Sequence, residues 1–143
     1  MQQLTNIKGK SVEASRLISF NRISDERGEL TVLEGDWHLP FEVKRVFYVN
    51  NPRGERGNHA HKRLHELLIP MFGSLTVELD DGHIQKTFNL FPNGTGLLIP
   101  PMVWARQYNF SHNCNYLVLA SMKYTESDYL HNYSEFVEMK RVG

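Results

Sequence analysis

Alternating apolar positions recur along the chain and predict short β-strands. Residues 46–48, 75–79 and 116–122 each carry an apolar set at every second position. A period of two puts alternate side chains on opposite faces of a strand. Many such segments at spacings near ten residues are typical of an antiparallel sandwich or small barrel. The pattern therefore predicts an all-β fold.

Turn-forming residues separate these segments. Residues 80–82 (Asp-Asp-Gly) and 92–94 (Pro-Asn-Gly) have the composition of tight hairpin turns. Further breaks are expected at residues 50–54 and 100–101. Within residues 129–137, aromatic and apolar side chains recur at helical spacing, so we expect one short C-terminal helix there.

The composition is that of one folded domain. The chain has 143 residues, 41% hydrophobic and 22% charged, which is enough for a core, and we predict a single domain over residues 1–143. The 16 Lys and Arg residues balance the 16 Asp and Glu residues, so the net charge is zero. Because nucleic-acid-binding surfaces normally carry a basic excess, we expect no nucleic-acid partner.

The sequence also lacks the usual signals for secretion or membrane insertion. Cys114 is the single cysteine, so no internal disulfide can form. Residues 1–17 contain no apolar run of signal-peptide length, and 18 apolar residues never occur in a row. We therefore expect a soluble, cytoplasmic protein with no membrane partner.

Two histidines stand two positions apart in residues 56–62, which read Arg-Gly-Asn-His-Ala-His-Lys. On a strand, His59 and His61 share a face and can point together into a barrel. Neutral imidazoles at this spacing can bind one metal ion, and imidazole also transfers protons near neutral pH. This pair is the first candidate catalytic site.

The spacing of His59, His61, Glu66 and Gly73 is similar to the first motif of the cupin superfamily. The second cupin motif is partly present, at Gly94, Pro100 and Asn109. Where metal-binding cupins carry their last histidine, this chain has Ala105. The resemblance implies a cupin, a small antiparallel jelly-roll barrel, that has lost one metal ligand. We expect no functional metal.

A longer ordered set of motifs extends over residues 16–137. It comprises Asp25-x-Arg27-Gly28-x-Leu30, Pro40-Phe41, Lys44-Arg45-Val46-Phe47-Tyr48, Arg56-Gly-x-His59-Ala60-His61-Lys62, Gly73-Ser74, Asp80-Asp81-Gly82, Ile99-Pro100-Pro101-x-x-Trp104, Phe110-Ser111, Leu117-Val118-Leu119-Ala120-Ser121 and Tyr124-x-Glu126-x-Asp128-Tyr129. As a set, these motifs resemble the dTDP-sugar 3,4-ketoisomerases.

That resemblance implies an enzyme that takes dTDP-4-keto-6-deoxyglucose and moves its carbonyl from C4 to C3 without a metal or other cofactor. Such enzymes supply deoxyamino sugars for surface polysaccharide, including lipopolysaccharide. The family also forms homodimers that exchange N-terminal strands, and residues 16–20 have the pattern of such a strand. Two positions depart from the family: Glu66 replaces a frequent glutamine, and His131 stands where arginine is common. His131 favours the galacto 3-keto product.

The reaction needs a base for the C3 proton and a donor for the developing oxyanion of the enediol(ate). His59 and His61 supply both groups, and either could be the base. Tyr48, Tyr108 and Tyr116 are candidate phenol donors, of which we carry Tyr48 forward as the catalytic candidate.

The nucleotide diphosphate requires cations, and six of them lie within residues 44–63. Arg27 is a further candidate, because its Asp-x-Arg-Gly element resembles that of dTDP-sugar 3,5-epimerases, where the arginine contacts phosphate. Trp104 could close the pocket, and Glu66 could orient a histidine. The candidate substrate-binding residues are Arg27, Arg45, Arg56, Lys62, Trp104 and His131.

Three other functions remain open. One is a metal-dependent cupin enzyme that uses His59, His61 and Glu66, against which Ala105 counts. Another is a dTDP-sugar 3,5-epimerase, which would abstract protons without moving the carbonyl. The last is a non-catalytic sugar-nucleotide-binding module, although binding alone does not require paired histidines.

Overall fold

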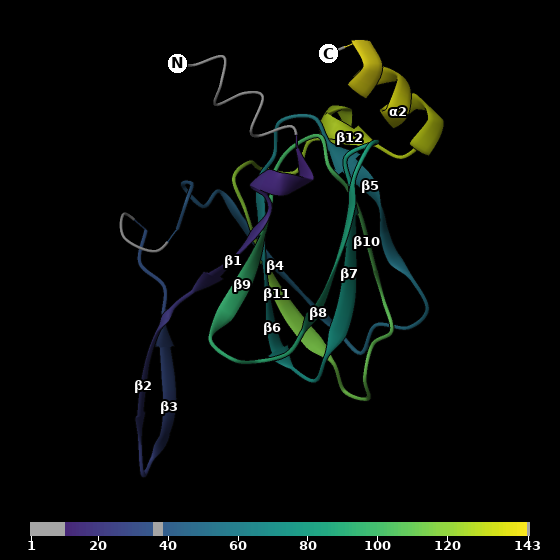
Figure 1. The fold of residues 1–143 in the computed structure, drawn as a ribbon. Coiled ribbons are helices and arrows are strands. Elements are labelled where there is room, and N and C mark those ends of the chain that lie inside the picture. The colour runs from purple at the N-terminus through teal and green to yellow at the C-terminus, as the bar shows by residue number, and fades with distance from the viewer. Residues whose placement is uncertain (1–10, 36–38, 143) are drawn as a thin grey trace.

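The computed structural model describes residues 11–35 and 39–142, and two five-stranded antiparallel sheets face each other in it (Figure 1). The first sheet has the order β1 (Arg16–Ser19), β9 (Thr95–Ile99), β6 (Glu66–Phe72), β11 (Asn115–Ala120) and β4 (Arg45–Asn50). The second has the order β12 (Tyr129–Leu130), β5 (Arg56–His61), β10 (Trp104–Tyr108), β7 (Leu75–Asp80) and β8 (Gln85–Leu90).

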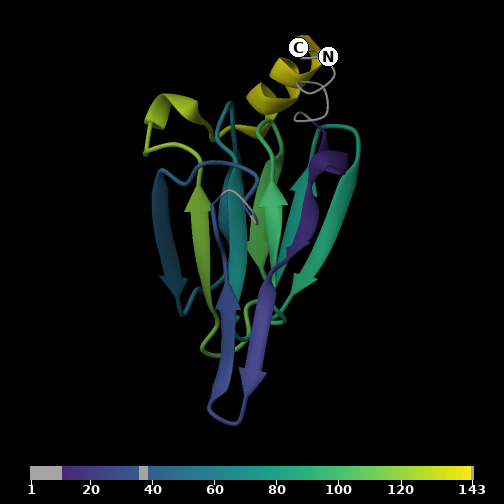
Figure 2. The ribbon, with the colours of Figure 1, turned by 90° about the vertical axis from the view of Figure 1, so that its left-hand side faces the viewer.

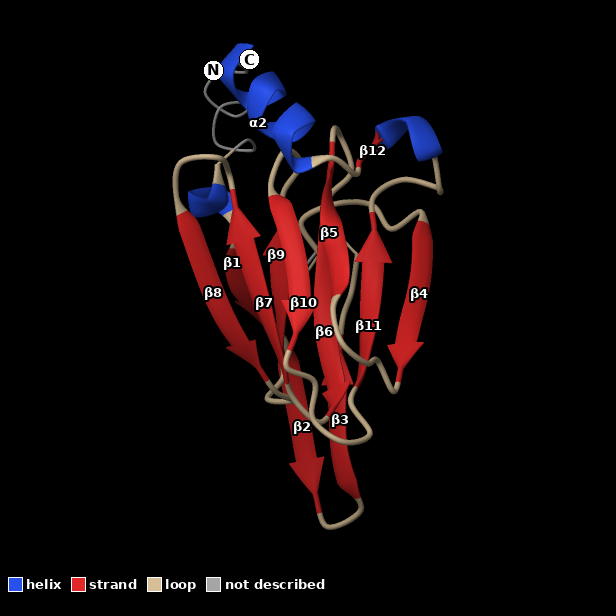
Figure 3. Cartoon of the chain, turned by 90° about the vertical axis from the view of Figure 1, so that its right-hand side faces the viewer, coloured by secondary structure: helices blue, strands red, loops and turns tan. Residues whose placement is uncertain are grey.

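A two-stranded hairpin and three short helices complete the described elements. They are β2 (Asn21–Asp25), β3 (Gly28–Val32), η1 (Val12–Ala14), η2 (Glu126–Asp128) and α2 (Tyr133–Val142). Figure 3 shows strands as the dominant element, with α2 at one end of the sandwich. The predicted all-β fold with a short C-terminal helix is confirmed. No helix among the described residues is long and apolar enough to cross a membrane.

The main core lies between the two sheets and follows the predicted alternation. Leu75, Val77 and Leu79 are at most 2% exposed and meet Leu68 and Val118 of the opposite sheet. Side chains at every second position of β7 therefore form one wall of the sandwich interior. The same rule sets which side chains of β4 and β5 can face the space between the sheets.

One of the two predicted hairpin turns is wrong. Residues 80–82 do join the paired strands β7 and β8. Residues 92–94 instead carry the chain from β8 in one sheet to β9 in the other. Gly94 has a φ of +76°, so the local turn chemistry is present. Turn composition does not reveal whether the two flanking strands pair with each other.

The C-terminal helix begins four residues later than predicted. Asn132 precedes it, and its side-chain oxygen accepts a hydrogen bond from the Glu135 N–H at 3.0 Å, which caps the first turn. The buried Phe136 then anchors the helix to the barrel. Tyr129, expected in the helix, lies in β12 opposite His61 of β5. The direction of its side chain is therefore set by its position on a strand and not by its position on a helix.

Residues 16–19 of the segment expected to form an exchanged strand lie in β1, which pairs with β9 of the same chain in this structure. The N-terminal element that extends away from both large sheets is the β2–β3 hairpin (Figure 2). It carries a cross-strand apolar pair, Ile23 and Leu30, whose exposed fractions are 51% and 59%.

The outer face of the first sheet is also apolar. Ile18, Leu67, Leu98 and Leu119 form a second cluster there, on the side away from the main core. Part of this cluster is covered by side chains that follow the hairpin, namely Leu33, Leu39, Phe41 and Val43. The edge strand β4 continues the face with an exposed Val46. The sandwich thus has apolar surface on both sides of one sheet.

Candidate functional site

A cavity of about 390 Å³ opens between the two sheets. It is lined by Arg45, Phe47, Val49, Arg56, Gly57, His59, Glu66, Leu68, Ile99, Gln107, Tyr116, Val118, Tyr124 and Tyr129. One part of the wall is aliphatic, and the other holds a histidine, a carboxylate, two arginines and three tyrosines. An apolar cavity with a few convergent polar groups is the usual form of a small-molecule site.

A bulge in β5 positions His59. Gly57 and Asn58 have φ values of +82° and +56°, and the register with β10 shifts there. The Gly57 carbonyl oxygen lies 3.1 Å from Nδ1 of His59. Because a carbonyl oxygen can only accept, Nδ1 carries the hydrogen and the lone pair is on Nε2.

Burial keeps this imidazole neutral. Desolvation lowers the pKa of His59 below its usual value, and the proximity of His61 acts in the same direction. The carboxylate of Glu66 and the Gly57 carbonyl oppose the shift without reversing it. His59 therefore offers a free Nε2 near neutral pH, as a proton acceptor requires.

His61 lies behind this wall rather than in it. Its side chain is buried, and its ring contacts that of His59 edge-on at 5.0 Å between centroids. Nε2 of His61 is 3.3 Å from Oε1 of Glu66, and Nδ1 is 3.5 Å from Oδ2 of Asp128. The two predicted catalytic histidines are thus adjacent, but of the two His59 lines the cavity.

Glu66 is a functional candidate rather than an exposed strand residue. Burial raises the pKa of its carboxyl group, but the hydrogen bond from His61 and the electrostatic interactions with the nearby His61, His59 and Arg45 side chains outweigh burial. The net shift is downward, so the carboxylate stays ionised in the cavity wall.

His59, His61 and Glu66 offer metal-ligating atoms that lie within 4.8 Å of one another. These atoms are close enough to hold one metal ion. Ala105 stands opposite His59 in the β5–β10 register and offers no fourth ligand. The arrangement supplies two imidazoles and one carboxylate, with water required for any further coordination.

The structure places Tyr48, the tyrosine carried forward as the catalytic candidate, outside the cavity. In β4, Phe47 and Val49 point into the cavity, and the period of two sends Tyr48 outward, where it is 70% exposed. The hydroxyl of Tyr108 donates to Glu78 at 3.2 Å, and Tyr108 does not line the cavity. Tyr116, the remaining candidate, does line it.

Tyr129 is a cavity residue that the sequence interpretation missed. Its ring lies 4.3 Å from that of His61 and 5.2 Å from that of His59. The Arg45 guanidinium donates to its hydroxyl oxygen at 3.4 Å. Tyr129 ends one of the family motifs, but the helix expected over residues 129–137 predicted the wrong direction for its side chain.

The substrate-binding candidates divide into two groups. Arg45 and Arg56 line the cavity, and His131 stacks on Tyr129 at 5.3 Å beside it. His131 also pairs with Glu126 at 2.9 Å. These three positions agree with a role around a ligand in the cavity.

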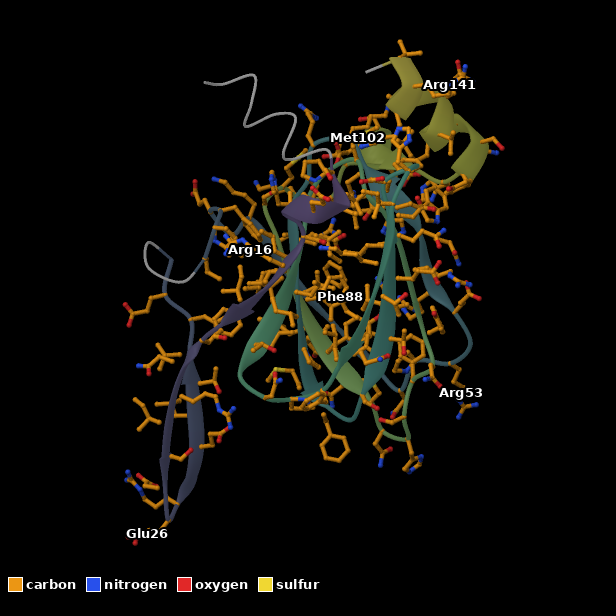
Figure 4. The ribbon with its side chains drawn as sticks, in the orientation of Figure 1. Arg16, Glu26, Arg53, Phe88, Met102 and Arg141 are labelled. Carbon is orange, nitrogen blue, oxygen red and sulfur yellow. The ribbon has the colours of Figure 1, made fainter. Side chains whose placement is uncertain are left out.

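Lys62, Trp104 and Arg27 do not line the cavity of this chain. Lys62 is exposed just past the end of β5. Trp104 packs against Phe136 of α2 at 5.7 Å, because its strand sends the neighbouring Ala105 inward. Arg27 follows Glu26, which Figure 4 labels at the hairpin tip, and its side chain is 86% exposed and paired with Asp25.

Comparison with known proteins identifies relatives of this chain. A family model named FdtA and described as "WxcM-like, C-terminal" matches residues 13–141. TDP-4-oxo-6-deoxy-alpha-D-glucose-3,4-oxoisomerase from Aneurinibacillus thermoaerophilus is 41% identical over 124 residues, which are 85% of this chain and 89% of that protein.

Solved structures show the same relationship. QdtA, a 3,4-ketoisomerase from Thermoanaerobacterium thermosaccharolyticum, is 36% identical, with a TM-score of 0.88 over 92% of this chain and 97% of that one. It was crystallised with TDP-4-keto-6-deoxyglucose as a variant in which one histidine is replaced by asparagine. A 3,4-ketoisomerase from Helicobacter canadensis is 38% identical, with a TM-score of 0.86 over 89% and 97% of the two chains.

The bulge that orients His59 can be tested through its glycine. A Cβ on Gly57 would lie 2.8 Å from the Ala105 carbonyl oxygen, whereas one on Gly54 would meet open space. Both residues have positive φ, so Gly54→Ala should cost about 1–2 kcal/mol of unfolding free energy through backbone strain alone. Gly57→Ala should cost clearly more. Urea denaturation measures both, and equal losses would show that the bulge tolerates a side chain.

Proposed function

Because the chain belongs to the FdtA family (WxcM-like, C-terminal) and is an isomerase of the sugar 3,4-ketoisomerase class, we propose that it converts dTDP-4-keto-6-deoxyglucose into the 3-keto sugar. The observation that carries this proposal is the neutral His59 in the cavity wall, with Nδ1–H held by the Gly57 carbonyl and Nε2 free. A base of this kind is what removal of a proton beside a carbonyl requires.

In the proposed reaction, Nε2 of His59 takes the proton from C3 of the sugar. The C–H electron pair forms a C3–C4 double bond, and the carbonyl electrons move to O4, which gives an enediolate. A proton then returns to C4, the O3 proton is transferred to O4, and the carbonyl forms at C3. Two protons change place and no electrons leave the substrate, so the reaction needs no oxidant or reductant.

We assign the donor to the developing oxyanion to Tyr129 in place of Tyr48. Arg45 donates to the Tyr129 oxygen, which leaves the Tyr129 O–H free to donate into the cavity. The O–H of Tyr116 is directed to the Gln107 side-chain oxygen at 3.5 Å. A preorganised donor in a cavity shielded from water stabilises charge that develops during the reaction.

His61 acts on the reaction through its neighbours. It pairs with Glu66 and packs against both His59 and Tyr129, so its loss would disturb three cavity groups at once. We therefore regard His61 as a positioning residue and His59 as the base.

The substrate-binding roles are also part of the proposal. Arg45 and Arg56 carry positive charge into the cavity and suit the nucleotide diphosphate. His131, at the edge of the cavity, would shape the sugar site and favour the galacto 3-keto product. The product would serve deoxyamino-sugar synthesis in the cytoplasm.

The experiment that tests this function is NMR of the product formed from dTDP-4-keto-6-deoxyglucose after treatment of the enzyme with a chelator. We expect a 3-keto sugar with galacto configuration at C4. A 4-keto product with inverted ring carbons would identify a 3,5-epimerase, and binding without turnover would identify a binding module. Activity that is lost on chelation and restored by a divalent metal would favour the metal-dependent cupin.

Replacement of the base should remove turnover. For His59→Asn we expect a loss in kcat of about 10²–10⁴-fold, the usual contribution of a general base. His61→Asn should lose less, and His83→Asn, which changes an exposed histidine, should match the parent enzyme. Deuterium wash-in from solvent at the sugar carbons should fall with turnover. Normal wash-in by His59→Asn would exclude this residue as the base.

Two tyrosines form a matched pair for the phenol donor. Tyr129→Phe removes a hydroxyl from the cavity, and Tyr48→Phe removes one from the outer face of β4. We expect Tyr129→Phe to lower kcat by about 10²–10³-fold, as loss of one oxyanion donor does. Tyr48→Phe should leave kcat unchanged. The reverse result in steady-state assays would restore Tyr48 as the donor.

A homodimer would explain the exposed apolar hairpin and bring Arg27 to a second cavity. Light scattering at micromolar concentration should give twice the chain mass of 16.6 kDa. A charge in the hairpin, Leu30→Asp, should weaken the dimer because Leu30 and Ile23 would be buried against the partner. Ile84→Asp, at a 44% exposed residue of the β7–β8 turn, is the control. A monomeric parent protein would contradict the proposed homodimer.

A further inference from the structure

Asp128 carries one of the most deeply buried carboxylates in the part of the chain that the structure describes, with 2% of its surface exposed. It ends η2, directly before Tyr129 of β12. Its Oδ1 accepts a hydrogen bond from the Arg63 N–H at 3.0 Å, and its Oδ2 accepts one from the Leu64 N–H at 3.3 Å. These two bonds fix the carboxylate relative to the loop that joins β5 to β6.

The fixed carboxylate faces His61. Oδ2 of Asp128 lies 3.5 Å from Nδ1 of His61, and this buried nitrogen has no hydrogen bond of normal length to any described residue. On the other side of the ring, Nε2–H donates to the ionised carboxylate of Glu66 at 3.3 Å. A buried ring nitrogen without a partner is costly, and an anionic acceptor nearby is the group that can satisfy it.

We propose that Asp128 is a positioning residue for the isomerase reaction, which accepts the hydrogen on Nδ1 of His61 while Nε2–H of the same ring donates to Glu66. The inference rests on the proposed function, since it states how His61, which packs against the proposed base His59, is kept in place. Asp128 is not among the residues that line the cavity, and it acts through His61 on Glu66 and His59. A carboxylate that fixes the orientation of a working histidine by accepting a ring N–H is a recurring arrangement.

The same carboxylate also ties two chain segments together, so a purely structural role must be distinguished from positioning. Asp81 offers a matched control. It is 4% exposed and accepts backbone hydrogen bonds from Val12, His83 and Ile84, but it lies in the β7–β8 turn and does not line the cavity. Replacement of either aspartate by asparagine should lower the midpoint of thermal unfolding.

Steady-state kinetics then separate the two roles. For Asp128→Asn we expect kcat to fall by about 10–100-fold, the size usual for loss of an outer partner of a functional histidine, with KM nearly unchanged. Asp81→Asn should keep the parent kcat. In a His61→Asn background, Asp128→Asn should cause little additional loss, because the residue through which it acts is already missing. A full multiplicative loss in the double variant would overturn the proposal.

A measurement on the unaltered protein does not depend on turnover or on the stability of variants. ¹⁵N NMR of the imidazoles reports which ring nitrogen of His61 carries a hydrogen, and we expect Nδ1 to be protonated. An unprotonated Nδ1 would overturn the proposal even if the isomerase activity is confirmed. A protonated Nδ1 whose signal shifts in Asp128→Asn but not in Asp81→Asn would support it even if the substrate proves different.

Discussion

The bulge in β5 is the local constraint on which the chemistry of the cavity depends. A regular strand would direct the Gly57 carbonyl toward a ladder partner in β10, whereas the positive φ values of Gly57 and Asn58 turn it toward His59. That single contact decides which nitrogen of His59 is free. The register shift also places Ala105 beside His59 instead of a polar residue. Backbone conformation, rather than another side chain, thus prepares the base.

The sequence was sufficient to predict those features of the site that depend on the residue pattern within a single strand. The i, i+2 spacing was enough to place His59 and His61 on one face, and the alternation in β7 was enough to find the core. It could not show which face of β4 is inward, because Val46, Phe47, Tyr48 and Val49 are all apolar or aromatic. The phase of the strand is fixed only by the opposite sheet, and Tyr48 was therefore misplaced.

Long-range placement decides where Trp104 and Arg27 lie. Trp104 packs against Phe136 of α2, a helix that begins after Asn132, and turn and periodicity signals do not encode this contact. Arg27 carries the strongest phosphate motif but lies at the tip of a hairpin that leaves its own barrel. A motif fixes the chemistry of a residue and its neighbours in sequence. It does not fix which cavity, or which copy of the chain, the residue serves.

The negative charge of Glu66 partly offsets the effect of burial on the pKa of His59, which a neutral glutamine at the same position could not do. Burial lowers the pKa of His59, which favours the neutral base but also weakens it, and the ionised Glu66 works against that loss. An anion beside a developing enediolate would by itself oppose the reaction. Arg45 acts electrostatically on Glu66 and donates to Tyr129, so the same guanidinium offsets the carboxylate and supports the oxyanion donor. Base strength and oxyanion stabilisation are therefore linked through one arginine at the cavity wall.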